Sequence, residues 1–176
     1  MRVLGVDPGS RAAGWALVIF ETSARLEEWG VLRPPSGLPL TRRLLWLRDA
    51  LGDVIERTRP DVASVERVFS GVNPQSLITL GEARGVLLIA LAERGVSIAE
   101  ITPAEVKRAV TGAGGAEKEQ VRRMVTALLG HRLPLDAADA AAAALAHGLF
   151  AAPRAARAVP PRPAPGLAGW KRRPGG

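Results

Sequence analysis

Short apolar runs that end at turn residues alternate along the chain with longer stretches of helical periodicity. The first run ends at Asp7, just before the Pro8-Gly9 turn. Its apolar residues lie on both faces, which predicts a strand in the middle of a covered sheet. Two more strands are predicted at Ala12–Phe20 and Leu26–Leu32, with a polar hairpin turn between them. These three strands are expected to form an antiparallel meander.

A helix and a fourth strand follow the meander. Leucines and an isoleucine at helical spacing predict a helix over Thr41–Arg57, and a buried strand at Val62–Val65 leads into Glu66. A strand–helix–strand crossover is right-handed and places the two strands parallel. Asp7 and Glu66 are therefore expected at the same end of two neighbouring strands, where open α/β sheets bind ligands.

The longest predicted helix, Pro74–Arg94, is apolar nearly all round in its second half. One face cannot bury all of these side chains against a sheet, so the other face is expected to meet a partner, most simply in a homodimer. A charge at Leu88 or Leu91 is expected to break that dimer. The longest strongly apolar run, Val86–Ala92, is too short to cross a membrane, so no membrane association is expected.

The remaining pattern predicts an α/β domain over residues 1–150. Its last elements are a fifth strand at Val96–Ile101, a short helix that Thr102-Pro103 caps, a helix at Ala116–Leu129 and a final helix from Pro134 to Phe150. From Ala151 onward Pro, Ala and Arg dominate without periodicity, which predicts a basic, disordered tail over residues 151–176.

Charge and composition limit the possible functions. The net charge of +7 resides mostly in the tail, because residues 1–150 carry 18 basic and 17 acidic side chains. Any phosphate-binding surface of the domain must therefore be a local patch. The chain has no cysteine, which excludes disulfides and thiolate metal sites. It has no signal-peptide pattern, so a cytoplasmic location is expected. The excess of Arg, Ala and Gly is interpreted as the bias of a GC-rich coding sequence.

Four acidic residues are the candidate chemistry. Asp136 and Asp139 are three residues apart, so they share one face at the start of the final helix, and they join Asp7 and Glu66. Taken alone, Asp7 is also consistent with the start of a turn, and Glu66 with a solvated residue at the edge of the sheet. The two aspartates are also consistent with stabilisation of the helix dipole. Together they form an all-oxygen donor set, which selects Mg²⁺ or Mn²⁺. Such a set can hold two ions roughly 3.5–4 Å apart, the arrangement that hydrolyses phosphodiesters.

Basic and aromatic residues near these carboxylates suit a nucleic-acid substrate. Lys107 lies on the short helix, Lys118 opens the next helix after a glycine-rich segment, and Arg67 follows Glu66. Only three of the 24 basic residues are lysine, and two of those are Lys107 and Lys118. Phe69, on the loop after Glu66, either stacks on a base or packs on the following helix.

Several segments resemble the motifs of the RuvC family of bacterial Holliday-junction resolvases, in order and with the family's spacing. They are Gly5-Val-Asp-Pro-Gly-Ser10, Val65-Glu-Arg-Val-Phe69, Leu80-Gly-Glu-Ala-Arg-Gly-Val86, Pro103-Ala-Glu-Val-Lys107, Ala116-Glu-Lys-Glu-Gln-Val121 and Asp136-Ala-Ala-Asp-Ala140. The resemblance covers about residues 1–150. It implies a ribonuclease H-like fold, a five-stranded mixed sheet flanked by helices.

The resemblance also implies an activity. A homodimer of this family nicks two opposed strands of a four-way DNA junction at symmetric positions, leaving 5′-phosphate and 3′-hydroxyl ends that ligase can seal. The four acidic positions bind the divalent metals and are catalytic, Phe69 corresponds to the loop phenylalanine that stacks on a base, and Lys107 and Lys118 to the important basic residues. The RuvA and RuvB branch-migration proteins are possible partners.

Other functions remain as alternatives. In the family the third acidic position can be a histidine, whereas Asp136 keeps the site all-oxygen. A related YqgF-type nuclease would process RNA, but that family lacks the Asp-Ala-Ala-Asp helix start. An inactive junction-binding module would not need all four carboxylates. An actin-like ATPase would need phosphate loops that this short chain lacks.

Overall fold

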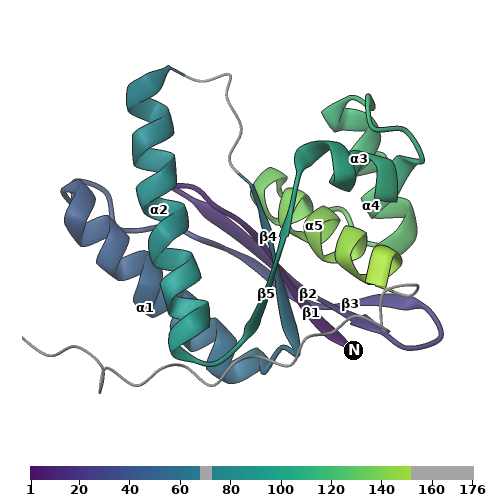
Figure 1. Ribbon diagram of the computed structural model, residues 1–176, viewed down its shortest axis with the longest axis horizontal. Coiled ribbons are helices and arrows are strands. Elements are labelled where there is room, and N and C mark those ends of the chain that lie inside the picture. The colour runs from purple at the N-terminus through teal and green to yellow at the C-terminus, as the bar shows by residue number, and fades with distance from the viewer. Residues whose placement is uncertain (68–72, 152–176) are drawn as a thin grey trace, which may run out of the picture.

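A mixed five-stranded sheet forms the middle layer of the molecule (Figure 1). The computed structural model describes residues 1–67 and 73–151. The strands are β1 (Arg2–Asp7), β2 (Ala13–Phe20), β3 (Ala24–Leu32), β4 (Val62–Glu66) and β5 (Ser97–Ile101), in the spatial order β3-β2-β1-β4-β5. The predicted meander is confirmed, because β1, β2 and β3 pair antiparallel. The crossover is confirmed too, since β4 pairs parallel with β1 and β5 pairs parallel with β4.

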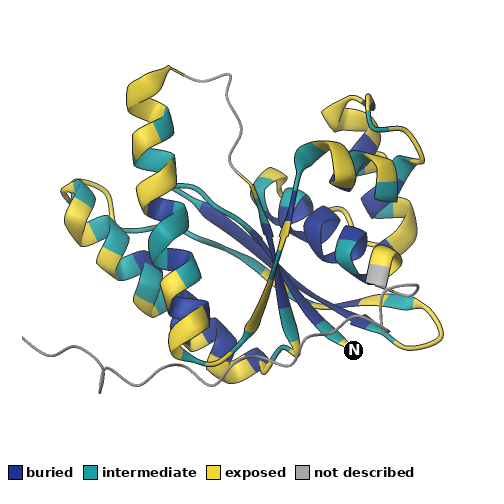
Figure 2. Ribbon diagram, viewed as in Figure 1, coloured by how far each residue is buried: buried dark blue, intermediate teal, exposed yellow. Residues whose placement is uncertain are grey.

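Helices cover both faces of the sheet (Figure 1). One face carries α1 (Leu40–Thr58) and α2 (Pro74–Glu93), and the other carries α3 (Pro103–Thr111), α4 (Lys118–Leu129) and α5 (Leu135–Ala151). Each face has its own apolar cluster, and the central strands β1, β2 and β4 between them are largely buried (Figure 2). Every predicted helix and strand is present, with ends that differ by one or two residues. Beyond Ala151 the predicted tail lies outside the described residues.

Helix α5 lies unusually close to the sheet. A Cβ atom added to Gly5 on β1 would lie 1.9 Å from the carbonyl oxygen of Ala140, and one added to Gly14 on β2 would lie 1.9 Å from that of Asp136. Eight alanines of the helix are buried: Ala137, Ala138, Ala140, Ala141, Ala142, Ala143, Ala144 and Ala146. The interpretation of the alanines as compositional bias is therefore wrong for α5, where small side chains let backbone pack on backbone.

Helix α2 has one buried and one exposed face. Leu87 and Leu91 are fully buried, whereas Ile78 and Ile89 are 56% and 51% exposed. The expectation that Leu91 faces a partner is wrong, because this side chain belongs to the core that α1, α2 and the sheet share. Leu88 is half-buried at the edge of the same cluster.

By length and composition alone, α2 would also qualify as a membrane span, and it is the single such helix in residues 1–67 and 73–151. Leu87 and Leu91 of α2 pack into the core, and Glu82 and Arg84 lie in the middle of the helix. Arg84 is tied by hydrogen bonds to the end of the sheet. We therefore interpret α2 as a helix of the packed domain.

Candidate active site

Two carboxylates extend from the carboxyl ends of the central parallel strands. Asp7 is the last residue of β1 and Glu66 is the last residue of β4. Val6 of β1 is in register with Val65 of β4. Asp7 and Glu66, the next residue of each strand, are therefore neighbours. Both are half-buried. The prediction that they share one end of the sheet is confirmed.

Helix α5 brings the other two carboxylates to this end. Asp136 lies in its first turn, and Asp139 follows on the same face. The close contact of the Asp136 backbone with Gly14 fixes the start of α5 over β2, beside the end of β1. Both aspartates are half-buried. The height of the helix above the sheet thus determines how near they come to Asp7.

The pKa values of the carboxyl groups record this proximity. The pKa of Asp7 is raised from 3.8 to about 8, mainly by burial and then, in decreasing order, by the negative charges of Asp139, Glu66 and Asp136. Burial and the charge of Asp139 also raise the pKa of Glu66. The carboxylates therefore interact electrostatically as one cluster, and a positive charge among them would lower its free energy.

Two lysines supply part of that positive charge. The pKa of Asp139 is raised by burial and lowered by Lys118, and Lys118 also opposes the rise at Asp7 and Glu66. Lys107 acts on Glu66. Lys118 is the first residue of α4, where a cation is unfavourable for the helix dipole, so a structural role does not account for it.

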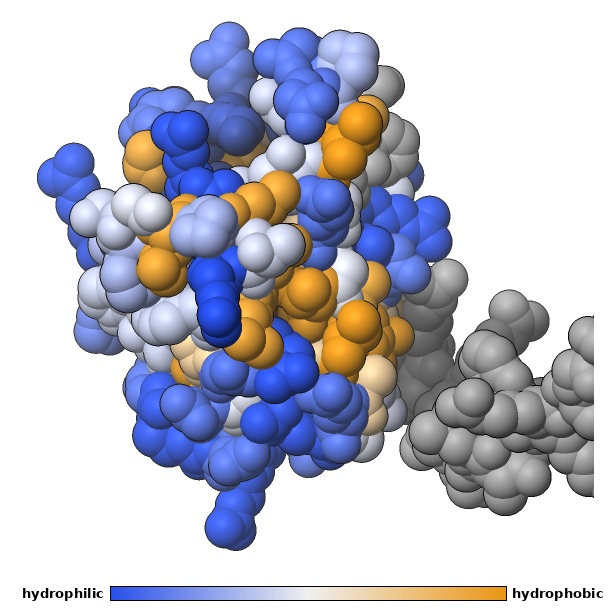
Figure 3. All heavy atoms as spheres, turned by 90° about the vertical axis from the view of Figure 1, so that its left-hand side faces the viewer, coloured by the Kyte–Doolittle hydropathy of each residue, from blue (hydrophilic) through white to orange (hydrophobic). Residues whose placement is uncertain are grey.

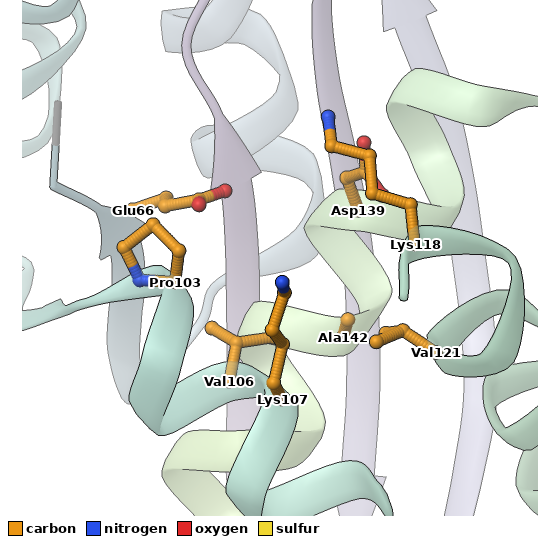
Figure 4. A pocket seen from close by; sticks show the side chains of 8 residues that line it. All are labelled: Glu66, Pro103, Val106, Lys107, Lys118, Val121, Asp139 and Ala142. Carbon is orange, nitrogen blue, oxygen red and sulfur yellow. The ribbon is translucent and has the colours of Figure 1, made fainter. Parts of the chain in front are cut away.

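A pocket joins the carboxylates to these lysines (Figure 4). Glu66 lines one side, Asp139 and Lys118 lie together on the other, and the ammonium group of Lys107 points between them. Apolar side chains form the rest of the wall: Pro103, Val106, Val121 and Ala142. The Thr102–Glu105 capping box fixes the start of α3 and so the direction of Lys107. The pocket therefore combines two acidic and two basic side chains with an apolar wall.

Two arginines near the carboxylates were missed by sequence reasoning. Arg33, just after β3, lies with its Nη2 atom 3.3 Å from Oδ2 of Asp136. Arg122 on α4 opposes the rise in the pKa of Asp139. Arg122 stands one helical turn beyond the predicted Lys118 and could have been found from that spacing. Arg33 follows a strand two places from β1, and no local pattern connects it to the site.

Arg67 and Phe69 are the other two predicted DNA contacts. The Nε atom of Arg67 lies 3.5 Å from the carboxylate of Glu100 on β5. Arg67 is exposed and does not line the pocket that Figure 4 shows. Phe69 lies outside the described residues, so its stacking role stays a prediction.

A hard divalent cation fits the donor set of this cluster. All four side chains are carboxylates, and three have pKa values raised by burial, so neutralisation by a cation would relieve both desolvation and repulsion. Among the described residues, no three His, Cys, Asp or Glu side chains are already gathered around one point as metal ligands. The carboxylates share one end of the sheet but do not form a closed cage.

Sequence comparison assigns most of the chain to one family. The family described as "Crossover junction endodeoxyribonuclease RuvC" matches residues 3–147. A protein of that name from Chloroflexus aurantiacus is 46% identical over 155 residues, which cover 86% of this chain and 94% of the relative.

Two solved structures have the same fold. The structure of RuvC from Thermus thermophilus matches with a TM-score of 0.81 and 33% identity, over 88% of this chain and 97% of that chain. RuvC of T. thermophilus in complex with a Holliday junction substrate matches with a TM-score of 0.80, over 86% of this chain and 94% of that one. The ribonuclease H-like fold expected from the sequence is confirmed. By sequence and by fold, the chain belongs to the RuvC family of crossover junction endodeoxyribonucleases.

Proposed function

We propose that this protein is a metal-dependent Holliday-junction resolvase. It binds four-way DNA junctions as a homodimer and makes paired, symmetric nicks that leave 5′-phosphate and 3′-hydroxyl ends, which serves recombination and DNA repair. The observation that carries the proposal is the cluster of four carboxylates beside two lysines at the carboxyl end of β1 and β4. Nucleases of this family are metal-dependent.

The four carboxylates are the proposed metal-binding and catalytic groups. Asp7, Glu66, Asp136 and Asp139 are the proposed ligands of two Mg²⁺ ions, for which Mn²⁺ can substitute. When bound, such ions activate water and stabilise the leaving oxygen of a phosphodiester. The carboxylates must be ionised for this role, and Lys118, whose charge acts on three of them, favours that state.

Basic side chains around the pocket are the proposed contacts to the DNA backbone. Lys107 and Lys118 line the pocket itself, so they neutralise phosphate next to the carboxylates. Arg67 is proposed to contact phosphate farther out, after release from Glu100. Phe69 is proposed to stack on a base at the opened junction.

The proposed dimer joins two active sites across the exposed face of α2. Apolar side chains gather on the side of the molecule that carries α1 and α2 (Figure 3). The exposed ones include Leu45, Ile78 and Ile89. A two-fold dimer through this face matches the two-fold character of a four-way junction. The RuvA and RuvB proteins are proposed partners of the complex.

The same proposal includes a division of the chain into two parts and a cellular compartment. Residues 1–150 form the nuclease domain, and residues 151–176 add six basic side chains without an acidic one. This tail is proposed to add salt-sensitive affinity for DNA. The proposed compartment is the cytoplasm, where the DNA substrate lies.

Cleavage of a synthetic mobile four-way junction in Mg²⁺ or Mn²⁺ tests the proposal, with a linear duplex as control. Wild type should give paired, ligatable nicks in the junction only. Asp7→Asn should lose cleavage and keep junction binding in a gel-shift assay. Binding without cleavage by wild type would indicate an inactive junction-binding module, and cleavage of structured RNA instead would indicate a YqgF-type nuclease.

A further inference from the structure

Arg84 links helix α2 to the end of the catalytic strand β4. Its Nε–H donates to the backbone carbonyl oxygen of Glu66 at 3.2 Å, and its Nη2 donates to the carboxylate of Glu100. The side chain is only 17% exposed. Glu100 also faces Arg67, so α2, β4 and β5 meet at this point.

The carbonyl of Glu66 faces β1. The N–H group of Arg67 donates to the carbonyl of Ile101 on β5 at 2.8 Å. In a trans peptide the carbonyl points the opposite way from the following N–H, so the oxygen of Glu66 points toward the strand on the other side, which is β1.

The position on β1 that would donate to this oxygen is a proline. Met1 and Phe20 exchange two hydrogen bonds, of 2.9 and 2.8 Å, so the first residue of the chain faces β2. Residues alternate along a strand, which makes the even-numbered ones face β4. With Val6 opposite Val65, the next bond of the parallel ladder would run from the N–H of residue 8 to the carbonyl of Glu66. Residue 8 is Pro8, which has no N–H.

We propose that Arg84 is a positioning residue for Glu66, and that its guanidinium replaces the ladder donor that Pro8 removes. An unsatisfied carbonyl at a half-buried strand end would turn to find a donor, and the Glu66 carboxylate would turn with it. Arg84 holds this peptide so that the carboxylate faces Asp7. The inference rests on the proposed metal site, in which Glu66 is a ligand.

Metal binding to the DNA-free protein tests this role without cleavage. Titration calorimetry with Mn²⁺ should show about tenfold or more weaker binding to Arg84→Met than to wild type, the effect typical of losing a group that orients a metal ligand. Arg84→Lys, which keeps one charged donor, should lie between the two.

Arg94 is the matched control. It lies at the end of the same helix and pairs with Glu56 on α1 at 2.9 Å and with the carbonyl of Ala90 at 3.4 Å. Arg94→Met removes a comparable set of contacts, an ion pair and a hydrogen bond to a backbone carbonyl, about 15 Å along α2 from Arg84. It should lower the melting temperature and leave the Mn²⁺ affinity at the wild-type level.

Pro8→Ala provides a rescue that a merely structural role would not show. This substitution returns an N–H group to the ladder position opposite Glu66. The loss of Mn²⁺ affinity caused by Arg84→Met should therefore be several-fold smaller in the Pro8→Ala background, a coupling that a double-mutant cycle measures.

Three results would overturn the inference: wild-type Mn²⁺ affinity in Arg84→Met, equal losses in Arg84→Met and Arg94→Met, or no coupling to Pro8→Ala. Glu66→Gln separates this from failure of the site itself. Weaker Mn²⁺ binding by Glu66→Gln with unchanged binding by Arg84→Met rejects only the role of Arg84. Unchanged binding by Glu66→Gln rejects the metal site and the inference together.

Discussion

Asp7 is a carboxyl group whose charged state is disfavoured in the metal-free fold. Burial and three neighbouring carboxylates raise its pKa from 3.8 to about 8. In the unfolded chain the group titrates near the ordinary value of about 3.9. Between those two pH values the folded protein keeps a proton that the unfolded chain releases. The fold is therefore stabilised by this group at low pH and loses that contribution as the pH rises toward 8.

We predict that the melting temperature of the metal-free protein falls by on the order of 5 °C or more between pH 5 and pH 8. Thermal unfolding in a chelator, followed by circular dichroism, measures this. Asp7→Asn should flatten the profile in part, since Glu66 and Asp139 also have raised pKa values and keep some slope. The same slope in wild type and in Asp7→Asn would assign the pH dependence to other groups.

At the scale of elements, the contact between α5 and the sheet sets the site. Gly5 and Gly14 leave no room for a Cβ atom beneath the helix, because the nearest carbonyl oxygens would lie 1.9 Å away. A methyl group there must push α5 outward. Since Asp136 and Asp139 belong to α5, the helix cannot move without carrying both carboxylates away from Asp7.

We predict that Gly14→Ala lowers the free energy of unfolding by about 1–3 kcal/mol and weakens Mn²⁺ binding as well. Chemical denaturation and titration calorimetry measure the two effects. Gly115→Ala is the control, because a Cβ at Gly115 has no neighbour within 4 Å and its φ is not positive. It should change stability by less than about 0.5 kcal/mol. Wild-type metal affinity in Gly14→Ala would contradict the link between helix height and site.

Some of this arrangement could be predicted from the sequence. The placement of Asp7 beside Glu66 follows from the handedness of a crossover and the direction of parallel strands, both of which are general. The elements themselves follow from periodicity and turn residues. Their ends shift by one or two residues, because capping geometry decides them.

The rest depends on contacts between distant residues. The approach of α5 to Gly14 joins positions more than 100 residues apart, and so does the pair of Arg33 with Asp136. Periodicity also failed on α2, where both faces are apolar and the pattern gives no sign that Leu91, rather than Ile89, points into the core. The donor to Glu66 could be found only from the register that sets Pro8 opposite it.

For the whole molecule, the exposed face of α2 has features that the packing of one chain does not explain. Ile78 and Ile89 are more than half exposed and lie eleven residues apart, three helical turns along one face. A Cβ atom added to Gly81 or Gly85 would meet nothing within 4 Å. Glycine in a helix costs about 1 kcal/mol relative to alanine, so close approach of a second copy would give these positions a function.

Ile89→Glu is therefore expected to yield monomers at concentrations where the wild type is dimeric, because the charge would be buried in the interface. Size-exclusion chromatography with light scattering measures the mass. Leu128→Glu is the control, since Leu128 is 43% exposed on α4, on the opposite face of the sheet, and should leave the dimer intact.

The activity of the monomer then tests the symmetry of the reaction. Each subunit carries its own four carboxylates, so Ile89→Glu should keep its metal site and the fall of its melting temperature between pH 5 and pH 8 in chelator. It should bind the junction more weakly and, on a supercoiled plasmid with one cruciform, give nicked circles where the wild type gives linear molecules. A dimer of unchanged mass in Ile89→Glu would exclude this face of α2, because a buried carboxylate at the centre of an apolar interface has no partner to neutralise it.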